Sequence, residues 1–285
     1  MAPTRVLYIS GSIGLGHAGR DLAIANELRR LHPDVEIVWL AGDPARRLLA
    51  DAGETLLPES AAFAEETASA ETAADGFSLN IVNFASQVAR GPWKGAVAAF
   101  EQVAARYPYD LLVGDESYEV AIALARRPEL KNGAPFTLIY DFVGMDATTW
   151  SPLERLIAYR INWLWSGGPR GRPPGEDRVL FIGEPEDVAD RPFGLFLPNR
   201  REHASRHYHF VGYAFPVDPP RTRTRTRCGL DSATTSARSS SAPSAGRRSE
   251  PTSSVSAPRP TRTSSAAFLV SAWCSSAGRG STPPR

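Results

Sequence analysis

The chain has 285 residues, enough for one large or two modest domains, and 42% of them are hydrophobic, as in ordinary globular proteins. No apolar run is long enough to span a membrane, and the N-terminus lacks the pattern of a secretory signal. Cys228 and Cys274 are too few for a disulfide framework, and no metal-ligand spacing surrounds them. We therefore expect a cytoplasmic protein without a metal site.

The formal charge of +1 is divided unevenly along the chain. From Pro219 to Arg285, eleven arginines stand against one aspartate and one glutamate, which gives this stretch a charge of +9 and leaves −8 for the rest. One cooperative fold rarely divides its charge so sharply. We therefore interpret residues 1–217 as a folded domain and residues 218–285 as a separate tail.

The first 217 residues alternate apolar strands with amphipathic helices. Strands are predicted at 5–10, 35–40, 110–114, 136–140, 179–182 and 207–211. Helices are predicted from about Leu22 to His32 and at 45–52, 93–106, 118–126 and 152–165, the second of them with Asp43 as its N-cap. This alternation predicts an α/β fold, a Rossmann-like parallel sheet with helices on both faces.

The loop after the first strand, Gly11 to Arg20, is rich in glycine and carries His17. In a doubly wound sheet, ligands bind beyond the carboxyl ends of the strands, where the strand order reverses. The usual order 3-2-1-4-5 places the first strand beside the strand 110–114, which leads into Asp115 and Glu116. A histidine and a carboxylate are therefore predicted to face each other, as a general base held in one tautomer by an acid.

Other interpretations of these residues remain open. The glycines of residues 14–19 also fit the dinucleotide fingerprint, with Asp43 as ribose ligand, which would make the chain an NAD(P)-binding Rossmann protein. The bulky His17 stands where the pyrophosphate would approach, and this disfavours the dinucleotide alternative. His17 and Asp115 could also simply cap their helices.

The run Gly14-Leu15-Gly16-His17-Ala18-Gly19-Arg20, directly after the first strand, resembles the glycosyltransferases of the GT-B fold. It is most similar to the family 28 group, with the lipid II N-acetylglucosaminyltransferase and the monogalactosyldiacylglycerol synthases. The segment His207–Tyr213 resembles the crossover that leads into the second domain of such enzymes. The resemblance extends from Arg5 to about Val217 and is specific mainly at its two ends.

The resemblance implies an enzyme that transfers a sugar from a nucleotide-sugar donor, UDP-linked, to an acceptor hydroxyl, with no other cofactor. His17 would deprotonate the acceptor hydroxyl, with Asp115 as its partner. Glycines at 11, 14 and 16 would let the backbone approach substrate or donor phosphate closely. The candidate substrate-binding residues are Gly11, Ser12, Gly14, Gly16, Arg20, Glu116 and Asp141.

The predicted helix 152–165 is rich in leucine, isoleucine and tryptophan. Such residues could contact a lipid-linked acceptor or the inner face of the membrane, as interfacial helices do. Packing on the sheet is the commoner arrangement, and we expect it here. Glu184 and Asp187, after a later strand, are weaker site candidates, because carboxylates at strand ends are commonly caps.

The tail 218–285 is dominated by Ser, Thr, Ala, Pro, Arg and Gly, which bury too little apolar surface to fold, so we expect disorder. Three origins fit this composition: a natural linker, a nucleic-acid-binding arm built on the Arg-Thr repeat at 221–227, and an out-of-frame translation. The arm would make the chain a non-catalytic binding module.

The genetic code favours the out-of-frame origin, and we expect no nucleic-acid partner. In a GC-rich gene, a shifted frame moves the third base of each codon to the second position, which produces the residue types of this tail. Reading back from Cys228 with permitted synonymous codons yields LVVCTVGGTAVG, then a helix-like segment and a second strand, the opening of a Rossmann-type half. We therefore expect that the tail replaces the donor-binding domain, so that the chain turns over little or not at all.

Overall fold

The computed structural model of the chain describes residues 3–11, 15–63, 74–75, 78–79, 81–82, 86, 92–168 and 175–215. The tail 218–285, and with it the expectations of disorder and of a shifted reading frame, lies outside the described residues. Ser12 and Gly14 of the glycine-rich loop also lie outside them.

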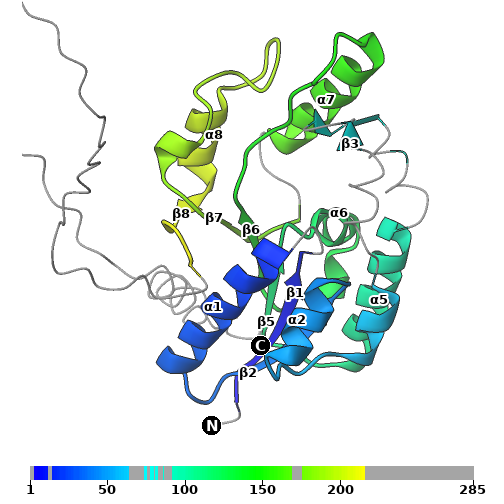
Figure 1. Cartoon of the computed structure of the whole chain (residues 1–285), viewed down its shortest axis with the longest axis vertical. Coiled ribbons are helices and arrows are strands. Elements are labelled where there is room, and N and C mark those ends of the chain that lie inside the picture. Colours follow the sequence, from blue (N-terminus) through cyan, green and yellow to red (C-terminus); the bar gives the residue numbers. More distant parts are fainter. Residues whose placement is uncertain are drawn as a thin grey trace, which may run out of the picture. The chain divides into compact units, whose positions relative to one another are not determined.

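A parallel sheet forms the centre of the N-terminal domain (Figure 1). Its strands are β1 (Arg5–Ser10), β2 (Glu36–Ala41), β5 (Leu111–Asp115), β6 (Phe136–Tyr140), β7 (Arg178–Phe181) and β8 (His209–Phe210). They are ordered β2-β1-β5-β6-β7-β8, and every pair is parallel. As predicted, β1 therefore lies directly beside β5.

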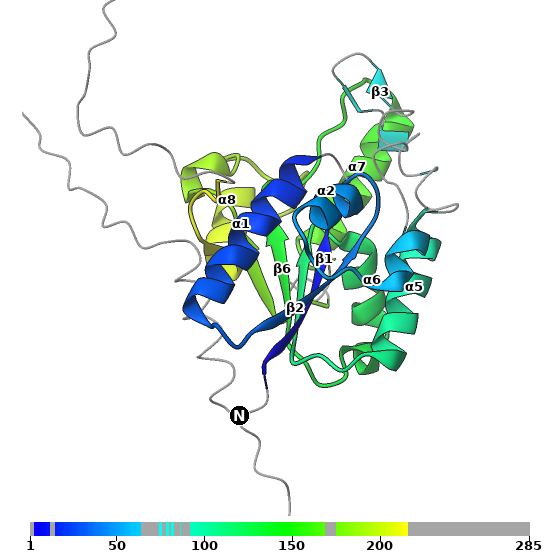
Figure 2. The same ribbon diagram turned by 60° about the horizontal axis from the view of Figure 1, so that its bottom comes forward.

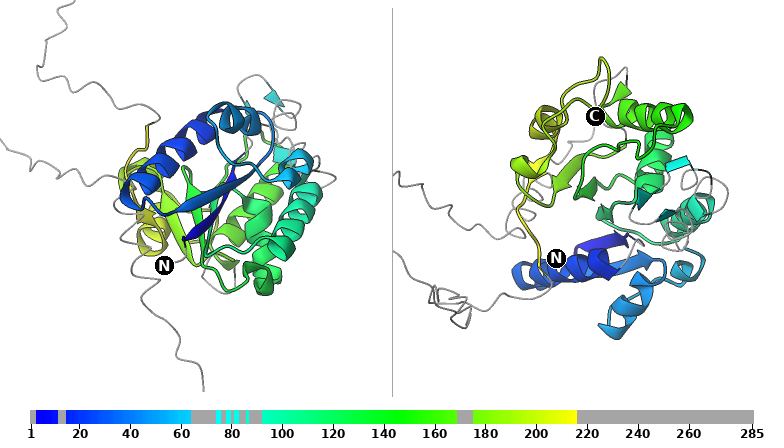
Figure 3. Two further views of the ribbon diagram at one scale, coloured as in Figure 1. Left: turned by 90° about the horizontal axis from the view of Figure 1, so that it is seen from below. Right: turned by 45° about the horizontal axis from the view of Figure 1, so that its top comes forward.

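Helices cover both faces of this sheet (Figure 3). They are α1 (Leu15–Leu31), α2 (Ala45–Asp51), α5 (Pro92–Arg106), α6 (Tyr118–Arg126), α7 (Pro152–Trp165) and α8 (Arg200–His207), with short 3-10 turns η1 (Pro58–Ala62), η2 (Pro128–Lys131) and η4 (Pro185–Asp187). The strands β3 (Ala74–Asp75) and β4 (Ser78–Leu79) form a separate antiparallel pair. Within the described part of the chain, no helix is both long and apolar enough to cross a membrane.

Alternate residues of β1 contribute to two separate apolar cores. Val6 and Tyr8 pack with α1 and α2, whereas Leu7 and Ile9 pack with α5 and α6. Trp39 of β2 is fully buried and stacks on Tyr8 with the ring centroids 4.4 Å apart. Because both faces of the sheet are covered, its central strands are apolar at nearly every position. The α/β class and the Rossmann-like arrangement are thus confirmed.

Two predicted boundaries are wrong. The first helix begins at Leu15, so His17 lies in its first turn and not in a loop. Residues 200–207 form α8, which leaves only His209–Phe210 of the strand predicted at 207–211. The sequence RREHASRH has almost no apolar stripe, so periodicity could not reveal this helix; the side chain of Asn199, which accepts a hydrogen bond from the Glu202 amide, is its start signal.

Among the described residues, β2 has one bridge partner on its outer side. There Leu56 forms an isolated parallel bridge with Trp39, in the place where the order 3-2-1-4-5 expects a third strand. The helix that follows β2 also differs from prediction, because Asp43 does not cap it. Pro44 occupies the N-cap of α2, and the carboxylate of Asp43 pairs instead with Arg46 and Arg47.

Candidate functional site

The carboxyl ends of β1 and β5 carry the two residues of the predicted catalytic pair. His17 lies in the first turn of α1, which starts just beyond β1 (Figure 2), and Asp115 is the last residue of β5. The Nδ1 atom of His17 lies 2.9 Å from the Oδ2 atom of Asp115. Asp115 does not cap α6, because Ser117 occupies the N-cap position. The structure therefore brings together the pair that the sequence predicted.

The proton on the His17 ring follows from its neighbours. Nδ1 also lies 2.9 Å from Nη2 of Arg20, and a guanidinium can only donate, whereas an ionised carboxylate can only accept. A bare Nδ1 lone pair facing the fully buried carboxylate of Asp115 would be repelled, so we assign the proton to Nδ1. The Arg20 contact is then between two donors that share one carboxylate. Nε2 keeps its lone pair and is the basic atom of the ring.

Arg20 connects two carboxylates beside the histidine. Its Nη2 donates to Oδ1 of Asp115 at 2.6 Å, and its Nη1 donates to Oδ2 of Asp141 at 2.8 Å. Burial lowers the pKa of the guanidinium, but its attraction to Asp115 and its hydrogen bond to Asp141 outweigh burial and raise the pKa. Arg20 therefore stays charged and neutralises the carboxylates nearest to His17. Its role in binding substrate stays a prediction.

Glu116 enters the site in an unusual state. Its backbone is left-handed, with φ of 49°, and its side chain is only 7% exposed. Burial, together with hydrogen bonding to Asp141 and the nearby negative charges, raises the pKa of this carboxyl to about 10. Glu116 is therefore a neutral acid that donates its proton toward Asp141. Its Oε2 atom lies 3.9 Å from Nε2 of His17, which is a close approach but not an ion pair.

The carboxylate of Asp141 accepts hydrogen bonds from Glu116 and from Arg20. Burial raises the pKa of Asp141, but the hydrogen bonds from Glu116 and Arg20 outweigh burial, so the pKa is lowered. The Asp141 side chain is 37% exposed, which makes it the most open acid of the group. The site therefore presents one ionised carboxylate, one neutral acid and one histidine nitrogen toward the space beyond the sheet edge.

Asp21, a buried carboxylate on the same helix as His17, was missed by the sequence interpretation. Asp21, fully buried, accepts hydrogen bonds from the Tyr8 hydroxyl at 2.9 Å and from the Ser10 hydroxyl at 2.6 Å. Burial, with the negative charge of Asp115 nearby, raises the pKa of Asp21. The available signal was its position: Asp21 lies on the same buried stripe of α1 as Ala18 and Ile24, where an acid needs a partner.

Gly11 and Gly16, the two described glycines among the candidate site residues, differ in what they permit. A side-chain carbon added at Gly11 would lie 3.1 Å from the carbonyl oxygen of Asp115, so Gly11 lets the end of β1 approach β5 closely. The same addition at Gly16 would meet no atom within 4 Å among the described residues. Among the described residues Gly16 therefore has open space on this side, and its role in binding substrate stays a prediction.

One atom each of His17, Glu116 and Asp141 lies within 4.8 Å of the other two, a spacing that could hold a divalent cation. The guanidinium of Arg20 already provides a positive charge beside these three groups. Glu116 carries a proton, and the guanidinium of Arg20 pairs with Asp141. A cation bound here would compete with the guanidinium of Arg20 for Asp141, and the expectation of a site without metal stays a prediction.

The remaining sequence candidates have structural roles. Glu184 and Asp187 form a reciprocal capping box at η4, and the Tyr213 hydroxyl donates to Asp187 at 2.6 Å. The expected packing of α7 on the sheet is wrong for part of its apolar residues. Leu153 is 55% exposed and Leu156 is 64% exposed, whereas Ala158 is buried and Trp165 packs against the core. The buried positions of α7 also include Glu154 and Asn162, whose side chains make internal hydrogen bonds.

No family model and no curated protein matches the chain. Matching solved structures include MurG of Acinetobacter baumannii, 15% identical over 64% of this chain and 42% of that chain, with a TM-score of 0.35. They also include the glycosyltransferase SnogD of Streptomyces nogalater, 18% identical over 70% and 49%, with a TM-score of 0.39. UGT71G1 of Medicago truncatula, complexed with UDP-glucose, is 12% identical over 65% and 46%, with a TM-score of 0.37. The chain spans about half the length of the solved structures it matches.

Proposed function

We propose that residues 1–217 are the acceptor-side half of a glycosyltransferase that takes its sugar from a UDP-linked donor. The observation that carries the proposal is the contact between His17 and Asp115, at the carboxyl ends of two adjacent parallel strands, where such sheets bind ligands. A histidine whose second nitrogen is held by a buried carboxylate suits removal of a proton from a hydroxyl. The resemblance of residues 14–20 to the GT-B glycosyltransferases supplies the reaction.

In the proposed reaction, the acceptor hydroxyl lies against Nε2 of His17, which takes its proton as the oxygen attacks the anomeric carbon of the donor. The bond from that carbon to the nucleoside diphosphate breaks, and the diphosphate leaves with the electron pair. Asp115 stabilises the imidazolium that forms, and Arg20 holds the second oxygen of Asp115 by a hydrogen bond. A displacement of this kind in one step inverts the configuration at the anomeric carbon.

Recognition of the donor is assigned to a second domain that residues 218–285 do not supply. We propose that a one-base shift in the codons between Val217 and Cys228 replaced that domain with the present tail. The chain as it stands then binds nucleotide sugars weakly and turns over little. With the frame restored, the protein is an ordinary two-domain transferase.

The acceptor is proposed to be lipid-linked, with α7 resting on the inner face of the membrane. Leu153 and Leu156 are exposed on α7, and Trp150 just before it is 86% exposed. The guanidinium of Arg155 lies 4.3 Å from the centre of the Trp150 ring. Apolar and cationic side chains mixed on one exposed helix are the pattern of helices that bind anionic membrane surfaces.

The experiment that tests the proposal restores the reading frame after Val217 and measures UDP release from UDP-sugars with a panel of hydroxyl acceptors. We expect acceptor-dependent release that His17→Ala abolishes. Saturable binding of NAD by the present chain would favour the dinucleotide alternative. Salt-sensitive binding of nucleic acid that disappears with the tail would favour the binding module with a basic arm.

A further inference from the structure

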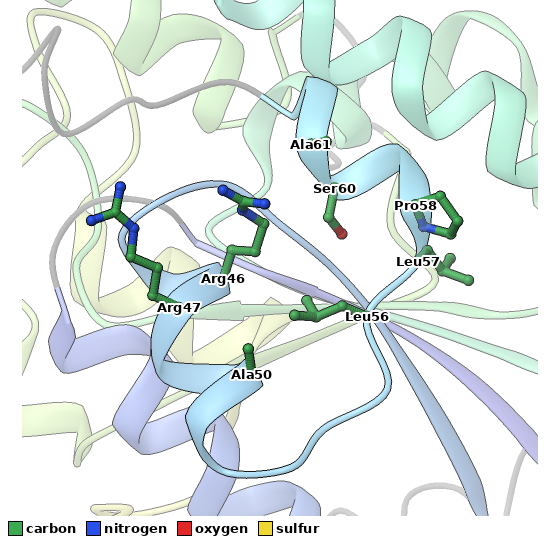
Figure 4. Close-up of a pocket in the computed structure, with 8 residues that line it drawn as sticks. All are labelled: Arg46, Arg47, Ala50, Leu56, Leu57, Pro58, Ser60 and Ala61. Atoms are coloured by element: carbon green, nitrogen blue, oxygen red, sulfur yellow. The ribbon is translucent and has the colours of Figure 1, made fainter.

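A second cavity lies apart from the His17 site, between α2 and η1 (Figure 4). Its volume is about 380 Å³, which falls in the range of pockets that hold small molecules. Leu56, Leu57 and Ala61 line one side of it, and Ala50 of α2 lines the other. None of the residues around His17 contributes to its lining.

Two arginines stand at the mouth of this cavity. Both residues line the cavity; Arg46 extends from α2 toward η1, whereas the guanidinium of Arg47 points away from Leu56, on the far side of Arg46 (Figure 4). Both pair with the single carboxylate of Asp43, at 2.9 Å for Arg46 and 3.4 Å for Arg47. Hydrogen bonding from Arg46 lowers the pKa of Asp43, so the three groups together carry one net positive charge. The Arg47 side chain is 76% exposed, which leaves its guanidinium accessible to an anion.

The rest of the lining offers little to a polar ligand. Ser60 is the one other polar side chain among the lining residues, and its hydroxyl already lies 3.3 Å from the Trp39 carbonyl and from the Ala41 amide. The cavity therefore combines an apolar interior with a cationic rim. A fully polar anion would leave the apolar surface wet, and a neutral hydrocarbon would leave the guanidinium charge without a partner.

We propose that this cavity is a second ligand site, and that it binds an anionic amphiphile: a phosphate or carboxylate head joined to a short apolar body. The head lies against Arg46 and Arg47, where bidentate hydrogen bonds from a guanidinium suit both anions. The apolar body lies against Leu56 and Ala50. The site goes beyond the proposed glycosyl transfer and does not depend on it.

The test titrates the full chain with decyl phosphate below its micelle-forming concentration and follows binding by calorimetry. We expect saturable binding at one site, at least tenfold tighter than that of inorganic phosphate or of decanol. Arg47→Gln should weaken binding about tenfold, and Ala50→Phe should abolish it by filling the cavity. Arg30→Gln, a matched loss of an exposed arginine on α1, should leave binding unchanged.

The same titration separates the sources of the ligand. Phosphatidylglycerol vesicles that compete with decyl phosphate would support the site with a membrane lipid as its source. Vesicles that leave the titration unchanged would support it with a soluble amphiphile. Decyl phosphate that fails to saturate, or that binds equally well to the Ala50→Phe variant with its fold intact by circular dichroism, would overturn the proposal.

Discussion

At the scale of single residues, the arrangement around Asp115 decides which nitrogen of His17 is the base. Asp115 accepts from Nδ1 of His17 at one oxygen and from Arg20 at the other, so both of its oxygens are used inside the protein. Asp115 therefore orients and stabilises the ring, and it cannot itself receive the proton from the acceptor. With Nδ1 engaged by Asp115, Nε2 is the ring nitrogen left to take a proton from an acceptor.

The first prediction concerns this orientation. In the protein with its reading frame restored, Asp115→Asn should lower kcat by a factor on the order of 10² to 10⁴, because an amide can donate to Nδ1 and so favours the wrong tautomer. The KM for the nucleotide sugar should change little, since we propose that the donor is bound by the other domain. Steady-state kinetics measure both constants, and an Asp115→Asn enzyme with unchanged kcat would contradict the assigned role.

The second prediction concerns Glu116 and the pH dependence of stability. Its pKa of about 10 lies above its ordinary value of 4.5, so the folded chain keeps a proton that the unfolded chain releases across this interval. Its contribution to stability is therefore greatest below about pH 4.5 and is lost as the pH rises toward 10. Glu116→Gln removes this titration, so the variant should gain stability relative to the parent by up to about 1.4 kcal/mol per pH unit.

Urea unfolding at pH 5.5, 7 and 8.5, followed by the fluorescence of buried Trp39, measures this difference. Glu36→Gln is the control, because Glu36 is exposed at the start of β2 and should change stability little at any pH. A Glu116→Gln variant that runs parallel to the parent at all three pH values would show that Glu116 is ionised in the folded chain.

The residues of the site were only partly predictable from sequence. His17 and Asp115 could be paired because strand order alone brings β1 beside β5, and Arg20 and Asp141 were among the candidates. Arg20 joins Asp115 and Asp141 because its long side chain extends from the first turns of α1 to both of them. Residue spacing in the sequence does not determine this conformation. Asp21 was missed because its partners, Tyr8 and Ser10, lie on β1. Which side chains of β1 face α1 is known only after the helix has been placed on the sheet.

At the scale of elements, α7 shows where sequence patterns fail. Its apolar residues predicted packing on the sheet, but Glu154 and Asn162 take the inward positions. Glu154 accepts hydrogen bonds from Thr148 at 3.0 Å and 2.9 Å, and Asn162 bonds to the backbone of Met145 at 2.7 Å. Buried polar partners therefore fix the orientation of this helix, and they lie too far along the chain for a periodicity of 3.6 residues to reveal them.

The third prediction follows from this orientation. The double change Leu153→Ser and Leu156→Ser should alter the free energy of unfolding by no more than about 0.5 kcal/mol each, because both side chains are largely exposed. The same variant should lose binding to anionic phospholipid vesicles in a sedimentation assay. Leu15→Ser, which removes a leucine that is 53% exposed on α1, should retain vesicle binding. Equal vesicle binding by all three proteins would remove α7 from the proposed membrane contact.

The fourth prediction contrasts α7 with α5. Phe100 of α5 is fully buried in the core that contains Leu7 and Leu112. Phe100→Ala should therefore lower the free energy of unfolding by about 3–5 kcal/mol, through lost burial and the cavity left behind. Urea denaturation measures the change, and a loss below about 1 kcal/mol would mean that α5 is not packed as described.

At the scale of the whole molecule, the division of charge is the basis of the predicted domain boundary near residue 217, which stays a prediction. The acidic first part contains the sheet, whereas the arginine-rich last part begins just past β8. The parallel sheet was predictable because strands buried on both faces stand out as apolar runs between helices. The function of the whole protein was less accessible, since the proposed recognition of the nucleotide sugar lies outside residues 1–217.

The most direct measurement of the central claim is a calorimetric titration of two proteins with UDP-glucose and UDP-N-acetylglucosamine: the chain as it stands, and the chain with its reading frame restored after Val217. We expect saturable binding of at least one of these donors to the restored protein and binding at least a hundredfold weaker to the present chain. A restored frame that ends within a few codons, or a restored protein that binds neither donor, would contradict the claim that these residues are one half of a nucleotide-sugar transferase.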